Sequence, residues 1–108
     1  MYKLSFYVPA SHLETVKEAV FAAGAGRIGG YDHCCWQTPG QGQFRPLRGS
    51  QPFIGDLDVV QTVNEYKVEM VCADHLVDQA IAALRQAHPY EEPAFAVVRL
   101  ESIPAPEN

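Results

Sequence analysis

Hydrophobic and polar residues alternate along residues 2–8, with the period expected of a strand that buries one face. Residues 11–23 follow with apolar side chains at helical spacing. The same order recurs toward the C-terminus, where an alternating segment at 65–71 precedes a helical pattern at 74–87 and a further alternating segment at 93–100. The pattern therefore predicts two strand–helix units, each followed by a strand.

Local signals refine these elements. Ser11 stands three residues before Glu14, the spacing of a capping box, and Asp74 is a candidate N-cap of the second helix. The core-facing positions predicted in the last strand are Ala94, Ala96, Val98 and Leu100. The apolar side chains predicted to lie on the opposite faces of their strands are Tyr7, Phe95 and Val97.

The middle segment, residues 24–64, contains all eight glycines and separates the two units. It is predicted to contain a strand at 30–37, a tight hairpin at 40–42 and short extra strands at 43–45 and 56–62. The side chains predicted to share one face of its first strand are Tyr31, His33 and Cys35. A connection of this length in a compact domain is usually functional or part of an interface.

Two β-α-β halves predict the ferredoxin-like plan β-α-β-β-α-β, an α+β fold in which two helices cover one face of an open four-stranded antiparallel sheet. We expect one such domain over residues 1–102. Residues 103–108 are expected to form a frayed tail, because their two prolines disfavour both helix and strand pairing. Identical subunits are one way to cover the open face.

Composition limits the partners and the compartment that we expect for this protein. The chain has 108 residues and a formal net charge of −5, and its eight basic residues are scattered, so we expect no nucleic-acid partner. No apolar run is long enough for a membrane span, and no signal-peptide pattern is present, so we expect no membrane partner. Three cysteines, two of them adjacent, do not form a disulfide framework, which predicts a reducing compartment, most simply the cytoplasm.

The first candidate chemistry is in the sequence His33-Cys34-Cys35. Histidine and cysteine ligate soft metals, and His33 and Cys35 would share a strand face, but a structural zinc site needs about four ligands. The alternative is that the cysteines are small buried hydrophobic residues. A cysteine nucleophile would also need a base that the sequence does not place.

The second candidate lies in His88-Pro89-Tyr90-Glu91-Glu92-Pro93. His88 with Glu91 or Glu92 would suit acid–base chemistry or a divalent cation. The alternative is a proline-locked turn in which His88 caps the preceding helix. Further loop or interface candidates are Tyr31, Trp36, Gly40, Gly42, Phe44, Arg45 and Tyr90. The glycines do not match a phosphate-binding loop, because no Gly-Lys-Ser/Thr follows them.

Four stretches of the chain resemble the YqfO/Nif-three-like family: Gly30 to Cys34, Gly40 to Pro46, Gly49 to Gly55 and His88 to Ala94. The resemblance extends from Tyr2 to about Leu100. This region is similar to the domain that is inserted into the middle of longer members. We therefore expect a standalone version of that domain. The resemblance implies a fold similar to the trimeric CutA and PII proteins, and hence a homotrimer.

The resemblance also limits the expected activity. Longer members bind a pair of metal ions in flanking domains, so their metal site and their hydrolase or cyclohydrolase label do not transfer to these residues. The middle segment of this chain corresponds in position to the ligand-responsive loop of PII-like proteins.

We therefore favour a non-enzymatic trimeric module that binds a protein or small-molecule ligand, with no firm cofactor. The first alternative is a divalent-metal-binding protein or small metal-dependent hydrolase with a site at a subunit interface. The second is an enzyme with a cysteine nucleophile.

Overall fold

The computed structural model describes residues 1–103 and shows four strands and two α-helices. Their bounds are β1 Tyr2–Pro9, α1 Leu13–Ala22, β2 Trp36–Phe44, β3 Gln61–Cys72, α2 Val77–Ala87 and β4 Phe95–Arg99. Short 3-10 turns, η1 (Ala10–His12) and η2 (Asp74–Leu76), precede the two helices. The strands form one antiparallel sheet in the order β2-β3-β1-β4, so the predicted α+β fold is confirmed. Most of the predicted frayed tail, from residue 104 onward, lies outside the described residues.

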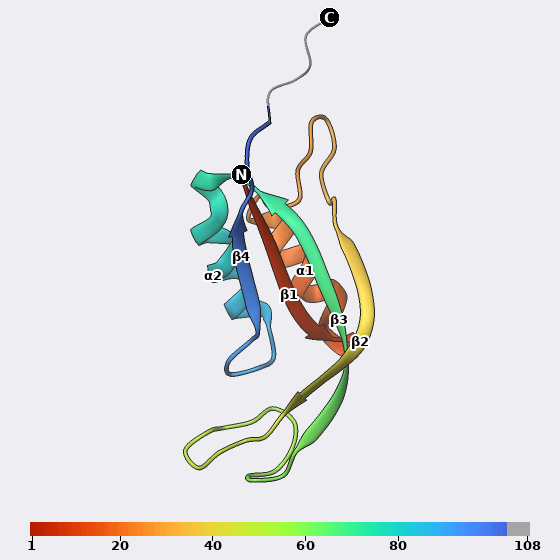
Figure 1. Ribbon diagram of the computed structural model, residues 1–108, viewed down its shortest axis with the longest axis vertical. Coiled ribbons are helices and arrows are strands. Elements are labelled where there is room, and N and C mark those ends of the chain that lie inside the picture. The colour runs from red at the N-terminus through yellow and green to blue at the C-terminus, as the bar shows by residue number, and fades with distance from the viewer. Residues whose placement is uncertain (104–108) are drawn as a thin grey trace, which may run out of the picture.

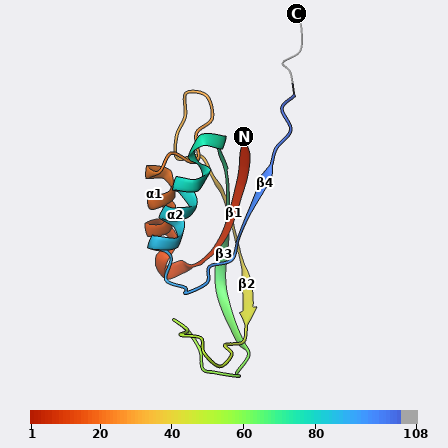
Figure 2. The ribbon, with the colours of Figure 1, turned by 90° about the vertical axis from the view of Figure 1, so that its left-hand side faces the viewer.

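Both helices lie on one face of the sheet, as the edge-on view shows (Figure 2). The apolar stripes of α1 and α2 pack on side chains that point to the same side of β1 and β3. Leu4, Phe6 and Val8 of β1 meet Val16 of α1 and Leu84 of α2, and all five are fully buried. Each such side chain stabilises the fold by about 1.5–3 kcal/mol relative to exposure. Among the described residues, no helix is both long and apolar enough to cross a membrane.

The face of β4 that packs against the core is opposite to the predicted face. Phe95 pairs with Phe6 and Val97 with Leu4, so both lie on the helix side and pack against the core. Val98 is instead 56% exposed. The prediction was wrong because β4 has apolar residues at both alternating positions, and a shift of one residue exchanges the two faces.

The middle segment also differs from the prediction. Residues 30–35 form no strand, and β2 begins only at Trp36. The predicted hairpin at 40–42 is wrong, because these residues pair with β3 in the interior of β2. The predicted short strand at 43–45 contributes the end of β2, and β3 begins at Gln61. Pro39 is tolerated because β2 is an edge strand.

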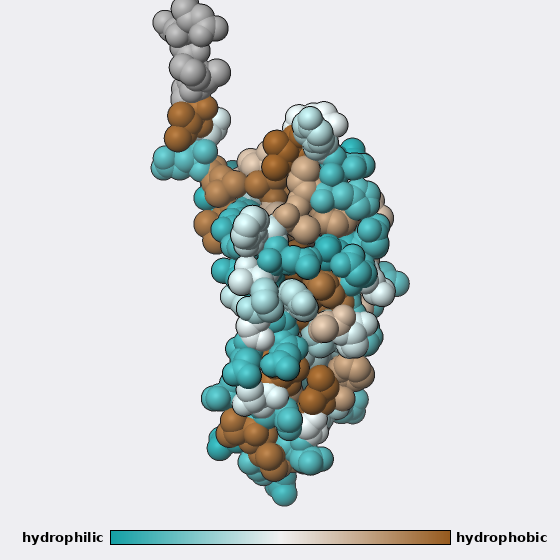
Figure 3. All heavy atoms as spheres, turned by 90° about the vertical axis from the view of Figure 1, so that its right-hand side faces the viewer, coloured by the Kyte–Doolittle hydropathy of each residue, from teal (hydrophilic) through white to brown (hydrophobic). Residues whose placement is uncertain are grey.

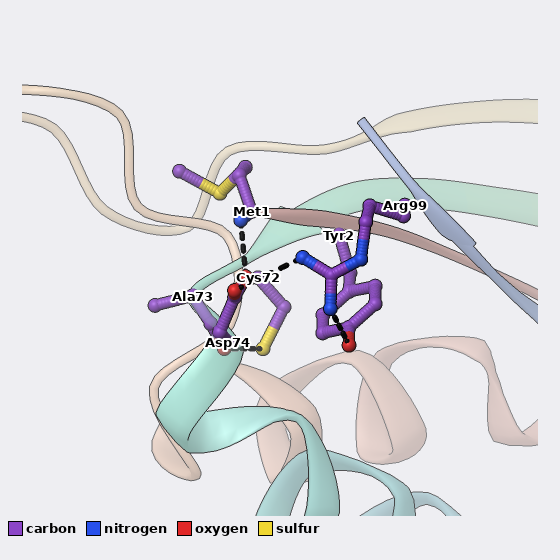
Figure 4. Close-up of polar contacts among 6 residues, drawn as sticks. All are labelled: Met1, Tyr2, Cys72, Ala73, Asp74 and Arg99. Carbon is purple, nitrogen blue, oxygen red and sulfur yellow. Dashed lines mark hydrogen bonds and ion pairs between the residues drawn. The ribbon is translucent and has the colours of Figure 1, made fainter. Parts of the chain in front are cut away.

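Neither predicted helix cap forms. Ser11 contacts the neighbouring His12 ring through its hydroxyl and caps no backbone group of α1. Asp74 makes no cap either, because its carboxylate binds the Met1 amine and, at 3.2 Å, the guanidinium of Arg99 (Figure 4). Arg99 also lies over the Tyr2 ring and donates to its hydroxyl. These ion pairs lower the pKa of Asp74, the Met1 amine having the larger effect and Arg99 the smaller.

Strands β2 and β3 extend beyond β1 as a two-stranded ribbon. Glu65 is the first β3 residue that pairs with β1, so residues 61–64 pair only with residues 41–44. The ribbon and the loop that joins its strands, residues 45–60, form the lower end of the molecule in Figure 1. Because an isolated two-stranded hairpin is marginally stable, this end depends on contacts with the rest of the domain.

Candidate functional site

A cavity of 590 Å³ lies where the ribbon meets the turn that follows α2. Residues 41–44 of β2, parts of loop 45–60, Glu65 of β3 and residues 90–92 of the turn line it. Figure 1 shows the turn in light blue above the yellow-green loop. The cavity thus brings together six residues that the sequence singled out: Gly42, Phe44, Arg45, Tyr90, Glu91 and Glu92.

Glu65 enters this cavity because Gly42 has no side chain. A Cβ atom at Gly42 would lie 1.9 Å from Glu65 Oε1, so the carboxylate occupies the space over the β2 backbone that a larger residue would fill. Glu65 is half-buried, and it has no ion-pair partner within residues 1–103. The glycine in the strand therefore has a specific role, to accommodate an acidic side chain.

Tyr90 forms the centre of an aromatic wall. Its ring centroid lies 6.2 Å from that of Phe44 and 6.3 Å from that of Phe53. Its hydroxyl oxygen is buried and makes no hydrogen bond to any described residue, although the nearby Glu65 carboxylate affects its titration. The pKa of Tyr90 is raised far above its usual range, with burial as the larger cause and the Glu65 carboxylate as the smaller. The phenol therefore stays protonated.

His88 lies beneath Tyr90 and supports it. The residue is 6% exposed, and its ring is 4.8 Å from the Tyr90 ring. Nε2 is 2.7 Å from the Tyr7 carbonyl oxygen, and Nδ1 accepts the Tyr90 backbone N–H at 3.1 Å. A neutral ring with its proton on Nε2 satisfies both contacts. Burial lowers the pKa of His88, which favours the neutral form.

Loop 45–60 folds back onto the domain at two points. The Gln51 backbone N–H donates to Glu91 Oε2 at 2.9 Å, which joins the loop to the turn. The Phe53 ring meets the His12 ring edge-on at 5.6 Å and also contacts Tyr90. These contacts hold the loop against the domain and close one side of the cavity.

The cavity lining is mostly apolar, with an excess of negative charge. Three carboxylates, from Glu65, Glu91 and Glu92, face one guanidinium, from Arg45. Glu91 already accepts a backbone hydrogen bond. Glu65 is the half-buried carboxylate of the cavity that can accept one from a ligand. Such an arrangement suits a ligand with an apolar body and a polar end.

Other predicted candidates lie elsewhere. Tyr31 is 76% exposed in a turn, and Trp36 is 70% exposed on the sheet face away from the helices. Gly40 lines a second hollow of 390 Å³ on that face. His33 is in the left-handed region, with φ 56°, while Cys35 packs against the core.

His33 interacts with two carboxylates. Its ring nitrogens lie 3.1 Å from Asp32 Oδ1 and 3.3 Å from Glu18 Oε2, and hydrogen bonds to Asp32 first and Glu18 second raise its pKa. Within residues 1–103, no three His, Cys, Asp or Glu side chains gather as a potential metal-ligand set.

Sequence reasoning missed two important residues of the cavity, Glu65 and Phe53. The alternation along residues 65–71 predicts only that Glu65 begins a strand, and its approach to Gly42 depends on the β2–β3 register. Phe53 follows a proline in a loop whose path no local pattern predicts. An acidic residue and a glycine on paired strands become a recognisable signal only once that pairing is known.

Comparison with known proteins agrees with this fold. No protein-family model matches the chain. A "GTP cyclohydrolase 1 type 2 homolog" of Mycobacterium tuberculosis is 46% identical over 104 residues, which cover 96% of this chain and 27% of that protein. The chain thus spans about a quarter of the length of the curated relatives it matches.

Solved structures give the same result. A Bacillus cereus protein related to NIF3 superposes with a TM-score of 0.81 at 36% identity, over 94% of this chain and 26% of the other. The divalent cation tolerance protein CutA of Archaeoglobus fulgidus superposes with a TM-score of 0.67 at 12% identity, over 94% of this chain and 86% of the other, which shows a shared fold. The predicted resemblance to the YqfO/Nif-three-like family and the predicted CutA-like fold are confirmed.

Proposed function

We propose that this chain is a non-enzymatic binding module of CutA/PII-like fold, and that it binds a small-molecule ligand or a partner's side chain in the 590 Å³ cavity. The observation that carries the proposal is the cavity itself, where an aromatic wall and a half-buried carboxylate come from β2, the loop, β3 and the turn after α2. Its volume lies in the range typical of small-molecule sites.

The chemistry of the lining supports binding over catalysis. Ser50 is the only serine among the described lining residues, and its hydroxyl donates to the Leu47 carbonyl oxygen at 2.7 Å. No cysteine or histidine of the described chain lines the cavity to act as nucleophile or base. The cyclohydrolase in the relatives' names is not part of the proposal, because the matched region is about a quarter of their length.

Self-association as a homotrimer is the second part of the proposal. Tyr7, Trp36 and Val98 are exposed on the sheet face away from the helices, and exposed apolar side chains of this size favour a covered face. We further place the protein in a reducing compartment, the cytoplasm, because its three cysteines are free thiols.

A cavity-filling variant tests the proposed binding. The probe is 2-phenylethanol, a neutral aromatic alcohol, titrated into the full chain while backbone amide NMR signals are followed. We expect saturable shifts at Gly42, Phe53 and Tyr90. Ala94 lines the cavity, so Ala94→Phe should weaken binding about tenfold or more.

Ala82→Phe is the matched control, because Ala82 is exposed on α2 outside the cavity lining. It should bind the probe as the unmodified chain does. Shifts that persist unchanged in Ala94→Phe would show that the probe binds outside the cavity and would contradict the proposal.

A further inference from the structure

We propose that the cavity selects organic cations: an amine or quaternary ammonium whose nitrogen lies beside the Glu65 carboxylate and whose apolar body lies against the rings of Phe44, Phe53 and Tyr90. This inference rests on the proposed function and adds the chemical class of the ligand. The groups that carry it come from β2, β3, the loop and the turn after α2.

The charge of the lining is the first argument. Arg45 is the only cation among the described lining residues, against three glutamates. Arg45 is exposed, whereas Glu65 is half-buried. An anionic ligand in the cavity would therefore approach an uncompensated carboxylate, while a cationic ligand would neutralise it.

The position of Glu65 is the second argument. Its carboxylate lies over the β2 backbone at Gly42, in the space where a side chain would project. Glu69, on the same face of the same strand, is instead engaged by Lys3 at 2.7 Å and by Lys67 at 3.5 Å. Of these two strand carboxylates, only Glu65 lacks a basic partner among the described residues and lines the larger cavity.

The aromatic wall is the third argument. Phenylalanine and tyrosine rings supply apolar surface for the body of the ligand, and their negative faces also favour a cation nearby. The Tyr90 ring is held from behind by His88 at 4.8 Å, and its backbone N–H donates to the His88 ring. Its hydroxyl is buried near the Glu65 carboxylate.

A set of three matched probes tests the charge selectivity. The probes are 2-phenylethylamine, which is cationic at about pH 7, neutral 2-phenylethanol, and anionic phenylacetate. Each is titrated into the full chain by calorimetry and by amide NMR. We expect the amine to bind about tenfold more tightly than the alcohol, and phenylacetate to bind more weakly than the alcohol. Added salt should weaken the binding of the amine and of no other probe.

Two variants assign the effect to Glu65. Glu65→Gln keeps the shape of the side chain and removes its charge, so the amine should lose about tenfold in affinity while the alcohol is unchanged. Gly42→Ala should also reduce the preference for the amine, because its Cβ would displace the carboxylate. Glu69→Gln is the matched control, with the affinity for the amine expected to stay within about twofold. Circular dichroism and thermal melting verify that each variant is folded.

The outcomes separate this inference from the proposed function. Equal affinity for the amine and the alcohol, tighter binding of phenylacetate, or an unchanged preference in a folded Glu65→Gln variant would overturn cation selectivity while the cavity remained a binding site. Failure of all three probes to bind would overturn the proposed function as well.

Discussion

At the scale of single residues, His88 shows how one side chain joins three parts of the fold. Its two ring nitrogens contact the Tyr7 carbonyl of β1 and the Tyr90 N–H of the turn, while its own backbone N–H donates to Leu84 at the end of α2. Each contact involves a backbone group, so loss of the ring would leave buried polar atoms without partners. His88 therefore positions the wall of the cavity rather than lining it.

A pH prediction follows from the neutral state of His88. Because its folded pKa is lowered from 6.5, the unfolded chain binds the proton first as the pH falls. The stability that His88 contributes is therefore present above about pH 6.5 and is lost as the pH falls through the folded pKa. Chemical unfolding between about pH 7.5 and about pH 5 should show this decrease.

The variant His88→Gln isolates the contribution of this ring. It should be less stable than the original chain by about 1–3 kcal/mol at neutral pH, and the gap should narrow toward acid pH. The raised pKa of His33 makes its contribution to stability change with pH in the opposite direction. This contribution is the same in both proteins, so it does not affect the difference between them. Parallel pH profiles for the two proteins would contradict this account.

At the scale of elements, β4 shows that alternation alone does not decide which face a strand buries. Residues Phe95 to Val98 are all apolar, so either face could be turned to the helices. Pairing with β1 decides the matter, because it places Phe95 beside Phe6 and Val97 beside Leu4. The Arg85 guanidinium on α2 also lies over the Phe95 ring, with its central carbon 5.1 Å from the ring centroid.

Two neighbouring substitutions in β4 distinguish the observed face from the predicted one. Val97→Asp would place a charge against the core and should destabilise the chain by about 2–4 kcal/mol. Val98→Asp lies on the exposed face and should change the stability of the monomer by about 0.5 kcal/mol or less. Denaturant unfolding at several protein concentrations separates monomer stability from self-association. A larger loss for Val98→Asp at low concentration would contradict the assignment.

At the scale of the whole molecule, exposed apolar residues are concentrated in two places. One is the sheet face away from the helices, and the other is the loop at the end of the β2–β3 ribbon. Figure 3 shows hydrophobic residues at the ribbon end of the molecule, interspersed with hydrophilic ones. The exposed apolar loop residues are Leu47, Phe53, Leu57, Val59 and Val60. Surfaces of this kind commonly mark interfaces.

The proposed trimer makes a prediction that light scattering and sedimentation equilibrium can check. The mass at micromolar concentration should be three times the 11.9 kDa of one chain. Val98→Asp should lower this mass, because it places a charge on the proposed interface while the fold is retained. A monomer mass for the unmodified chain throughout the concentration range would refute the trimer.

Local sequence patterns were sufficient to predict the order of strands and helices and the core stripes of β1 and α1. Val16 and Val20 lie at helical spacing, and Leu4 and Phe6 alternate with polar residues, so each element buries one face wherever it packs. The sequence also singled out five polar or aromatic residues of the cavity, because turns rich in glycine and proline are recognisable from local chemistry. They are Phe44, Arg45, Tyr90, Glu91 and Glu92.

Only the tertiary structure decided which face of β4 is buried, how far β2 extends, and that Glu65 lies over Gly42. These features depend on the register between strands that are distant in sequence, and a shift of one residue in that register exchanges the two faces of a strand. The cavity depends on such a pairing, since its walls include residues 41–44 of β2, Glu65 of β3 and the turn at residues 90–92, which are distant in sequence and meet in the folded domain.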